Sequence, residues 1–536
     1  MSAPLLELRS LSVDAPARGG GAMRIVHDIS FSLNRGEVLG LIGESGAGKS
    51  TIGMATMGAA RGGAWIGGGQ VMIEGADIMT AGPAFLRELR GRRVAYVAQS
   101  AAAAFNPAFR LIDQVIELSV DRGVMTEAEA RARAIALFRR LELPSPETFG
   151  QKFPHQASGG QLQRAMTAMA MCARPELIVF DEPTTALDVT TQVEVMLAIR
   201  QAIREERMAA LYISHDLAVV AQMVDRIMVL RHGRMIETGT AAQVLGAPQS
   251  PYTRQLIDAR ALRHDPVAEG DPLLKLSGVT AAYGNTVVAE GLDMVLPKRR
   301  TLAVIGESGS GKSTLGKVIC GLLPPREGQL WFDGHDLPGE VRRRSIDDLR
   351  RIQLVHQIPD LAMNPRQRVA EIVGQPLTRF FGMKGAARAA RVAELLQLVE
   401  LDPALADRLP MGLSGGQKQR VCIARALAAD PAMIVCDEVT SALDPLVADG
   451  VLKLLLRLQA EKGMSYLFIT HDFSSVRAVA DHVAVMRQGR IVRQGPTTQV
   501  LSPPFDSYTE TLVQAVPELR IGWLDDLTAA RAAALT

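Results

Sequence analysis

Cysteine is scarce in this sequence. Only four cysteines occur among 536 residues, and no two of them form a Cys-x-x-Cys pair. The cysteines are widely scattered, so nothing in their spacing indicates a zinc site, a disulfide framework or a redox motif, and we interpret them as small buried hydrophobic side chains. The four cysteines are Cys172, Cys320, Cys422 and Cys436.

Long apolar runs are also missing. Hydrophobic residues make up 47% of the chain, yet no stretch of about 18 apolar residues runs without a charge or a helix breaker. We therefore expect no membrane-spanning helix. Residues 1–12 lack the basic and apolar regions of a secretory signal, so we expect a cytoplasmic protein.

Neither sign of charge is in excess. Lysine and arginine number 59 against 57 acidic residues, which leaves a formal net charge of +2. A nucleic-acid-binding protein usually carries a strong positive field, so we expect no nucleic-acid partner. The arginines at 342–344 and 350–351 are interpreted as the solvated face of a helix, with a specific anion site as the alternative.

The sequence does contain an internal repeat. Lys49 and Lys312, in matching glycine-rich loops, lie 263 residues apart. Later landmarks recur 256 residues apart, including Tyr252 and Tyr508 near the end of each half. A repeat of this length indicates two homologous domains.

Each half is typical of an α/β domain. Buried strands alternate with helical segments, as in a largely parallel sheet, and amphipathic helical inserts occupy 127–143 and 386–401. The stretch between the halves is charged, contains two prolines and lacks apolar periodicity, so it is predicted to be a linker. The predicted organisation is a first domain over 1–257, a linker over 258–272, a second domain over 273–516 and a C-terminal tail over 517–536.

A glycine-rich loop follows an early apolar strand in each half. GESGAGKST and GESGSGKST both match the phosphate-binding pattern GxxxxGK[ST]. Glycines permit the tight turn, backbone N–H groups face the phosphates, the lysine neutralises charge, and the serine hydroxyl can hold Mg²⁺. One copy could be an ordinary turn, but two copies in matched context predict two ATP sites. The predicted nucleotide-binding residues are Gly43, Glu44, Ser45, Gly46, Ala47, Gly48, Lys49, Ser50, Thr51, Gly306, Glu307, Ser308, Gly309, Ser310, Gly311, Lys312, Ser313 and Thr314, with Ser50 and Ser313 also as metal ligands.

Paired acids end another apolar strand in each half, where they resemble the Walker B motif. Asp181 and Glu182 follow LIVF, and Asp437 and Glu438 follow MIVC. A carboxylate at the end of a buried strand can hold Mg²⁺ through water, and the next carboxylate can position or deprotonate the attacking water. A solvated strand end is the alternative. The repeat favours Asp181 and Asp437 as metal ligands and Glu182 and Glu438 as catalytic residues.

A histidine follows a third apolar strand in each half. His215 stands in LYISHD and His471 in LFITHD. Alone, each would be interpreted as a core histidine or a helix cap. Together with the loops and paired acids, both are predicted to contact the γ-phosphate of ATP.

A fourth motif narrows the range of families that the sequence resembles. ASGGQ at 157–161 and LSGGQ at 413–417 resemble the signature of the ABC transporter family, in which a helix N-terminus donates to a phosphate held by the opposite domain. Ala157 replaces the family's leucine, which should loosen local packing and leave the donors in place. The signature residues predicted to bind nucleotide are Ser158, Gly159, Gly160, Gln161, Ser414, Gly415, Gly416 and Gln417.

The resemblance assigns further residues. Gln99 and Gln357 match the family's Q-loop and are predicted at the catalytic site and its metal ion, while 186–188 and 442–444 match the D-loop. It covers roughly residues 5–516. It implies two tandem ABC-type P-loop domains, each an α/β core with an N-terminal antiparallel β part and a helical subdomain.

Tyr283 matches the family's adenine-stacking aromatic residue. An ordinary strand residue is the alternative interpretation of Tyr283. The first half has Ala15 at this place, so we expect a weaker adenine contact there, with Met23 or another side chain as a substitute. Family domains dimerise head to tail. This implies one site that joins Lys49, Asp181, Glu182 and His215 to Ser414 and Gly416, and another that joins Lys312, Asp437, Glu438 and His471 to Ser158 and Gly160.

Smaller features indicate the branch of the family. Asn-Pro follows each Q-loop, Pro-His-Gln precedes the first signature, and Pro-Tyr-Thr-Arg begins at Pro251. These features resemble the peptide, nickel and opine uptake ATPases in their fused form. The resemblance implies ATP and Mg²⁺, two membrane permease subunits, an indirectly associated substrate-binding protein, a peripheral position on the cytoplasmic side of the inner membrane, and a peptide-like cargo. No cysteine follows Cys436, so no iron–sulfur cluster is expected.

Other tandem ABC proteins are less consistent with the sequence. Translation factors of this type have a long charged helical linker, DNA-repair proteins have zinc-binding cysteine clusters, and fused exporters have membrane spans. A non-catalytic scaffold would not need Glu182 and Glu438. The translation factor remains the alternative function.

Overall fold

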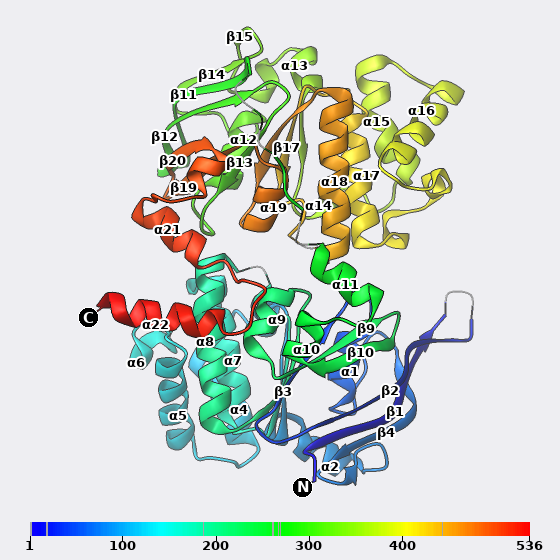
Figure 1. The fold of residues 1–536 in the computed structure, drawn as a ribbon, viewed down its shortest axis with the longest axis vertical. Coiled ribbons are helices and arrows are strands. Elements are labelled where there is room, and N and C mark those ends of the chain that lie inside the picture. Colours follow the sequence, from blue (N-terminus) through cyan, green and yellow to red (C-terminus); the bar gives the residue numbers. More distant parts are fainter. Residues whose placement is uncertain are drawn as a thin grey trace. The chain divides into compact units, whose positions relative to one another are not determined.

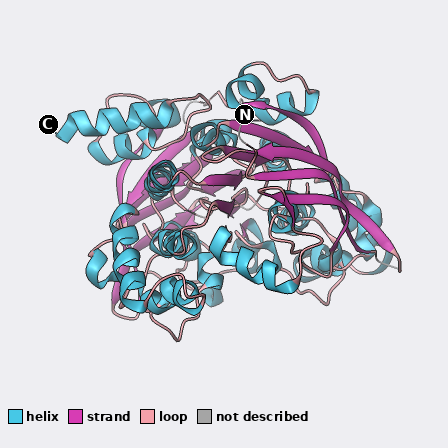
Figure 2. Cartoon of the chain, turned by 90° about the horizontal axis from the view of Figure 1, so that it is seen from below, coloured by secondary structure: helices cyan, strands magenta, loops and turns pink. Residues whose placement is uncertain are grey.

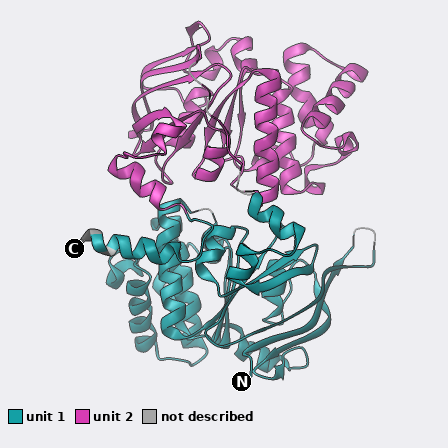
Figure 3. Ribbon diagram, viewed as in Figure 1, with its two compact units in different colours: residues 1–258, 517–536 teal, residues 259–516 magenta. Residues whose placement is uncertain are grey.

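The computed structural model describes residues 3–17, 20–185, 187–259, 262–265, 267, 270–441 and 443–535. The chain divides into two compact units, which Figure 3 colours separately. Unit 1 contains Met1–Asp258 and Pro517–Thr536, and unit 2 contains Ala259–Val516.

Unit 1 contains two sheets (Figure 1). The four-stranded antiparallel sheet has the order β2 (Ala22–Leu33), β1 (Leu6–Pro16), β4 (Trp65–Ile73) and β5 (Ala76–Asp77). The six-stranded sheet has the order β10 (Arg234–Thr240), β9 (Arg226–Arg231), β3 (Val38–Ile42), β8 (Ala209–Ile213), β7 (Leu177–Asp181) and β6 (Val94–Val97). All neighbours in the second sheet run parallel except β9 and β10.

Unit 2 repeats this topology. Its antiparallel sheet has the order β12 (Thr286–Pro297), β11 (Pro272–Tyr283), β14 (Glu327–Phe332) and β15 (His335–Asp336). Its six-stranded sheet has the order β16 (Ile352–Val355), β17 (Met433–Asp437), β18 (Ser465–Ile469), β13 (Thr301–Ile305), β19 (His482–Arg487) and β20 (Arg490–Pro496). The α/β architecture predicted from the sequence is confirmed in both units.

Helices pack beside both sets of sheets (Figure 2). In unit 1 they are α1 (Lys49–Ala55), α2 (Pro83–Glu88), η1 (Leu89–Arg93), α3 (Ala101–Ala104), α4 (Leu111–Asp121), α5 (Glu127–Arg140), α6 (Pro146–Phe149), η2 (Pro154–Gln156), α7 (Gly159–Cys172), α8 (Val189–Glu206), α9 (Leu217–Met223), α10 (Ala241–Gly246), α11 (Pro251–Asp258) and α22 (Trp523–Leu535). In unit 2 they are α12 (Lys312–Ile319), η3 (Val341–Arg343), α13 (Ile346–Arg351), α14 (Pro359–Ala362), α15 (Val369–Phe381), α16 (Gly385–Leu398), η4 (Pro403–Asp407), η5 (Pro410–Gly412), α17 (Gly415–Leu427), α18 (Pro445–Lys462), α19 (Phe473–Val479), α20 (Thr497–Val500) and α21 (Ser507–Gln514).

The central parallel strands β3, β7 and β8 are buried along their whole length. Strands covered on both faces read as continuous apolar runs, which explains LIVF and similar stretches in the sequence. Because neighbouring parallel strands end at the same edge, the loops after β3, β7 and β8 are brought together there.

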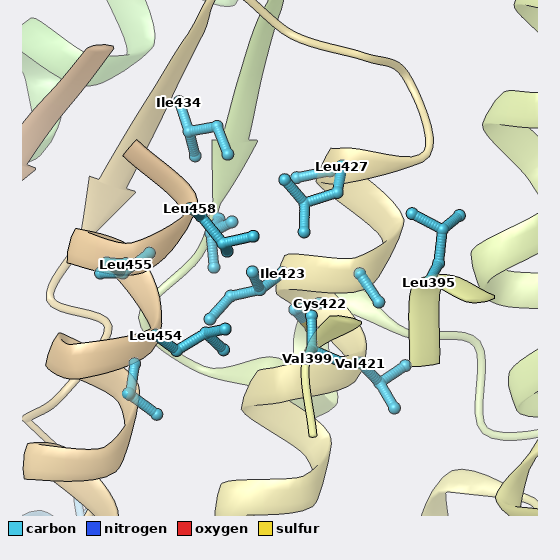
Figure 4. Packing of buried hydrophobic residues seen from close by; sticks show 14 of the residues in the cluster. Leu395, Val399, Val421, Cys422, Ile423, Leu427, Ile434, Leu454, Leu455 and Leu458 are labelled. Carbon is cyan, nitrogen blue, oxygen red and sulfur yellow. The ribbon is translucent and has the colours of Figure 1, made fainter. Parts of the chain in front are cut away.

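The helical inserts form where the amphipathic pattern predicts them. Helix α5 begins after a capping box between Thr126 and Glu129 and packs with α4 and α7. Figure 4 shows the corresponding core of unit 2, where α16, α17 and α18 interdigitate over β17. The labelled side chains there are Leu395, Val399, Val421, Cys422, Ile423, Leu427, Ile434, Leu454, Leu455 and Leu458. Three of the four cysteines are buried, as expected, and Cys320 is partly buried.

Part of the predicted linker packs on unit 2. The His264 ring lies 2.9 Å from a carboxylate oxygen of Asp481, and the Val267 backbone N–H donates to the same oxygen at 3.0 Å. Burial opposes ionisation of Asp481, but these contacts and a backbone N–H from Thr301 lower its pKa. Residues 260, 261, 266, 268 and 269 of the linker lie outside the described residues.

The C-terminal segment packs on unit 1. The Gln222 side-chain amide donates to the carbonyl oxygens of Glu518 (3.0 Å) and Arg520 (2.7 Å) and accepts from the Leu524 backbone N–H (3.1 Å). Trp523 and Leu524 are buried. The segment is therefore an integral part of unit 1. Within the described residues, no helix has the length and apolarity needed to cross a bilayer.

Replacing Gln222 with alanine should loosen the C-terminal segment, because three hydrogen bonds to its backbone are lost. We expect faster cleavage of the segment in limited proteolysis, with the rest of the chain intact. Gln201→Ala is the control, since Gln201 is exposed and its amide contacts Glu205. Equal cleavage rates in the two variants would contradict this role of Gln222.

Candidate active site

The glycine-rich loop of unit 1 connects β3 to α1 at the edge where the central strands end. Gly43 has φ +145°, and a Cβ there would lie 2.1 Å from the Leu230 carbonyl oxygen, so only glycine fits. The Lys49 ammonium donates to the carbonyl oxygens of Gly43 (2.6 Å) and Glu44 (2.9 Å). The loop therefore wraps around the lysine side chain.

Unit 2 has the same loop geometry. A Cβ at Gly306, with φ +148°, would lie 2.1 Å from the Met486 carbonyl oxygen. The Lys312 ammonium donates to Gly306 O (2.8 Å) and Glu307 O (2.7 Å). Both predicted phosphate loops are thus closed around a buried ammonium group.

The first acid of each pair lies beside the loop serine. The Ser50 hydroxyl donates to Asp181 at 2.8 Å, and the Ser313 hydroxyl donates to Asp437 at 3.0 Å. Burial raises the pKa of Asp437, although Ser313 opposes this. Each unit therefore presents a hydroxyl and a carboxylate oxygen side by side.

The second acid of unit 1 is held by two predicted site residues. The Gln99 side-chain amide donates to one carboxylate oxygen of Glu182 at 2.7 Å. The other oxygen lies 3.2 Å from His215 Nδ1. Burial opposes ionisation of Glu182, but His215 and Lys49 outweigh it and lower the carboxyl pKa.

Unit 2 repeats this arrangement. Gln357 donates to Glu438 at 2.5 Å, and His471 Nδ1 lies 3.2 Å from the other Glu438 oxygen. The pKa of Glu438 is lowered for the same reasons as in unit 1. Burial lowers the pKa of both histidines, but the facing glutamates raise it overall. Each glutamate is thus an ionised proton acceptor whose oxygens are oriented.

One contact was not predicted from the sequence. The Tyr96 hydroxyl in β6 donates to the Asp181 oxygen that does not face Ser50. The corresponding strand of unit 2, β16, has Leu354 at this place. Tyr96 stands three residues before Gln99, on a strand that pairs with β7. This closeness to the Q-loop was the feature of the sequence that could have indicated the contact with Asp181. The carboxylates of the two units therefore have different surroundings.

The signature residues lie at the N-termini of α7 and α17. Ser158 caps α7, where its hydroxyl accepts from the Gln161 backbone N–H, and Ser414 caps α17 in the same way. A Cβ at Gly160 would lie 2.3 Å from Thr191, whereas one at Gly159 would meet nothing within 4 Å. The second glycine is required for packing against α8, and the first leaves the helix N-terminus open.

The positions beside the signatures differ between units. Leu413 is buried and Ala157 is partly buried. In the D-loops, Asp188 caps α8 and Asp444 caps α18. Ala186 and Ala442 lie outside the described residues.

Strand register shows that Ala15 in unit 1 occupies the position equivalent to Tyr283 in unit 2. Val13 pairs with Val26 as Ala281 pairs with Ala289, so the residues two places later correspond. Ala15 pairs with Met23, whose side chain is exposed. Residue Tyr283 is 46% exposed, and its hydroxyl accepts from Lys317 of α12 at 3.3 Å. The Lys317 ammonium also lies 5.8 Å from the ring centroid of Tyr283.

Two family models match the chain. The model described as ABC transporter matches residues 26–185 and 289–441, which contain the loops and paired acids of both units. The model described as oligopeptide/dipeptide transporter, C-terminal region, matches residues 236–278 and 492–534. Both models therefore occur twice, in agreement with the internal repeat.

Known relatives match nearly the whole chain. The peptidoglycan transport ATP-binding protein YejF of Agrobacterium fabrum is 36% identical over 96% of this chain and 96% of the relative. The glutathione import ATP-binding protein GsiA of Escherichia coli K12 is 35% identical over 92% of this chain and 86% of the relative. The solved structure of cbiO1 from Clostridium perfringens, part of the ABC transporter complex cbiONQ, is 31% identical, covering 43% of this chain and 90% of that chain with a TM-score of 0.39. The chain belongs to the ABC transporter family, as an ATP-binding ATPase with two tandem ABC domains.

Proposed function

We propose that this chain drives an importer for peptides or peptide-like small solutes. The carrying observation is that each half ends in a match to the oligopeptide/dipeptide transporter C-terminal region. The relatives named for glutathione import and peptidoglycan transport support the same class of cargo. In this proposal, domains at 1–257 and 273–516, joined by 258–272, attach to two permease subunits on the cytoplasmic face of the inner membrane, with a substrate-binding protein as an indirect partner.

The phosphate loops supply the ATP-binding groups in this proposal. Lys49 and Lys312 exchange loop carbonyl oxygens for phosphate oxygens when ATP binds, and the loop N–H groups donate to the same phosphates. The paired oxygens of Ser50 with Asp181 and of Ser313 with Asp437 fit Mg²⁺, which prefers oxygen ligands. When bound, Mg²⁺ neutralises charge on the phosphate oxygens. Gln99 and Gln357 are the remaining metal-site residues that we propose.

The glutamates act on the attacking water. Glu182 and Glu438 are ionised at neutral pH because their pKa values are lowered, so they can accept its proton. His215 and His471 hold one carboxylate oxygen and contact the γ-phosphate. The signature residues 158–161 and 414–417 donate to phosphate, as the family resemblance implies.

The alternative function as a translation factor is less well supported. Helix α11 ends at Asp258 and β11 begins at Pro272, and the described residues between them include the His264 contact to unit 2. A segment this short and partly anchored does not supply a long helical arm.

Glu182→Gln combined with Glu438→Gln should reduce ATP turnover by at least about 100-fold, because general-base catalysis typically contributes 10²–10⁴-fold. ATP affinity should change little, since the substitution keeps the side-chain shape. Steady-state hydrolysis and equilibrium ATP binding provide the two measurements. The control is Glu205→Gln, in an exposed acid on α8. Wild-type turnover in the double variant would show that these carboxylates do not act on the water.

Tyr283→Ala should weaken ATP binding at one of the two sites. Loss of an aromatic stack costs roughly 0.5–1.5 kcal/mol, or about twofold to tenfold in affinity. A two-site binding isotherm for ATP separates the sites, and Tyr283→Phe should retain most of the affinity. An equal loss at both sites would contradict the assignment of Tyr283 to adenine.

Exposed apolar side chains follow the Q-loop of unit 2. Leu361 is 82% exposed on α14, and Ile358 is half exposed. Such side chains commonly mark protein contacts. We propose that the segments 99–107 and 357–365 contact the permease subunits.

Leu361→Glu should separate hydrolysis from transport, because a charge replaces an apolar contact outside the phosphate loops. We expect wild-type ATP affinity, loss of uptake in cells, and loss of co-isolation with two integral membrane proteins. Ile346→Glu, at another exposed apolar residue, is the control. Recovery of the wild-type chain with ribosomes, and not with membrane proteins, would replace the importer with the translation factor.

A further inference from the structure

A tyrosine from the C-terminal part of each unit reaches the phosphate loop. The Tyr252 hydroxyl on α11 accepts from the Glu44 backbone N–H at 3.2 Å, and the Tyr508 hydroxyl on α21 accepts from the Glu307 backbone N–H at 3.2 Å. The tyrosines lie 208 and 201 residues from the loops that they contact. Two independent halves of the chain thus make the same long-range contact.

Both tyrosines are fixed in place. Tyr252 is 4% exposed and Tyr508 is 7% exposed. The Arg231 guanidinium lies 4.6 Å from the Tyr252 ring centroid, and the Arg487 guanidinium lies 4.7 Å from the Tyr508 ring centroid. A cation over the ring face attracts it electrostatically and restricts the side chain. The hydroxyl position is therefore set by β9 or β19 as well as by its own helix.

The backbone segment that contacts the tyrosine also holds the ammonium group of the loop lysine. The Glu44 backbone N–H donates to the Tyr252 hydroxyl, and the Glu44 carbonyl oxygen accepts from the Lys49 ammonium. The Gly43 carbonyl oxygen accepts from the same ammonium. In unit 2, the Glu307 backbone N–H donates to the Tyr508 hydroxyl, and the Glu307 carbonyl oxygen accepts from the Lys312 ammonium. A hydroxyl that fixes this segment also fixes where the ammonium group sits before phosphate arrives.

We propose that Tyr252 and Tyr508 are positioning residues for ATP binding, which hold the first turn of each phosphate loop in its binding conformation. This inference rests on the ATP sites proposed above and assigns a task to the C-terminal region, whose family match includes both tyrosines. Without the hydroxyl, the loop samples other conformations. The apparent affinity for ATP then falls in proportion to the fraction of loops in the binding conformation.

The test is the double variant Tyr252→Phe with Tyr508→Phe, which keeps both rings and removes both hydroxyls. We expect KM for ATP to rise about threefold to tenfold, the effect of losing the hydrogen bond to the loop N–H at each site. Removing the Tyr508 hydroxyl also breaks its 3.5 Å hydrogen bond to the Met486 carbonyl oxygen. Turnover at saturating ATP should stay within about twofold of wild type, because ATP selects the binding conformation. Hydrogen exchange at the backbone N–H groups of Glu44 and Glu307 should accelerate.

Tyr466→Phe is the matched control. Tyr466 is also a buried tyrosine, and its hydroxyl donates to the Leu455 carbonyl oxygen, away from both loops. This variant should lower thermal stability without changing KM for ATP. If the double variant behaved like Tyr466→Phe, with reduced stability and unchanged KM, the tyrosines would be structural only and the inference would be overturned.

A second comparison separates this inference from the proposed site. Lys49→Ala with Lys312→Ala should abolish ATP binding measured by calorimetry. If ATP still bound, the phosphate-loop assignment itself would be wrong. If binding were lost in the lysine variant but unaltered in the tyrosine variant, only the positioning role would fail.

Discussion

The parallel pairing of β3, β8 and β7 is the constraint on which each site depends. Hydrogen bonds align Leu39 with Leu211 and Ile178 with Ala210, so the three strands end at one edge. The pairing continues one step further, because the Glu182 backbone N–H donates to Ile213 O. Glu182 then turns into the left-handed region with φ +52°. A non-glycine residue adopts this conformation at a cost that the surrounding sheet must offset, and Glu438 repeats it at φ +50°.

The sequence was sufficient to predict those site residues that lie in short motifs of fixed spacing. The loops, paired acids and histidines lie within short motifs that immediately follow apolar strands, and each motif occurs twice. The contact of Tyr96 with Asp181 joins residues 85 apart, and that of Tyr252 with Glu44 joins residues 208 apart. These contacts depend on which strands become neighbours and on where the terminal helices pack. No periodicity in the sequence records that information, although the repeated tyrosine did indicate that the tails are homologous.

The two sites share their reacting groups and differ around them. Lysine, serine, both acids, glutamine and histidine are the same in each unit. Three differences lie near the proposed sites: Tyr96 in unit 1 against Leu354 in unit 2 beside the first acid, Ala15 against Tyr283 at the predicted adenine position, and Ala157 against Leu413 before the signature. Each changes packing or orientation and leaves the shared side chains unchanged. In the proposed sites, the two halves therefore differ in the surroundings of the nucleotide, while the proposed catalytic side chains are the same in both.

The segments that follow the two tyrosines are anchored at equivalent positions by different side chains. After Tyr252 the chain continues to His264, which contacts Asp481 in unit 2, and 256 residues later Arg520 contacts Gln222 in unit 1. One anchor is a histidine–carboxylate pair and the other is an amide bound to backbone carbonyl oxygens. Both secure the chain beside the helix that follows the site histidine, α19 or α9. Each anchor lies within one unit, because His264 and Asp481 both belong to unit 2 and Gln222 and Arg520 both belong to unit 1. A short segment of chain therefore connects the tyrosine that contacts a phosphate loop with an anchored stretch of backbone.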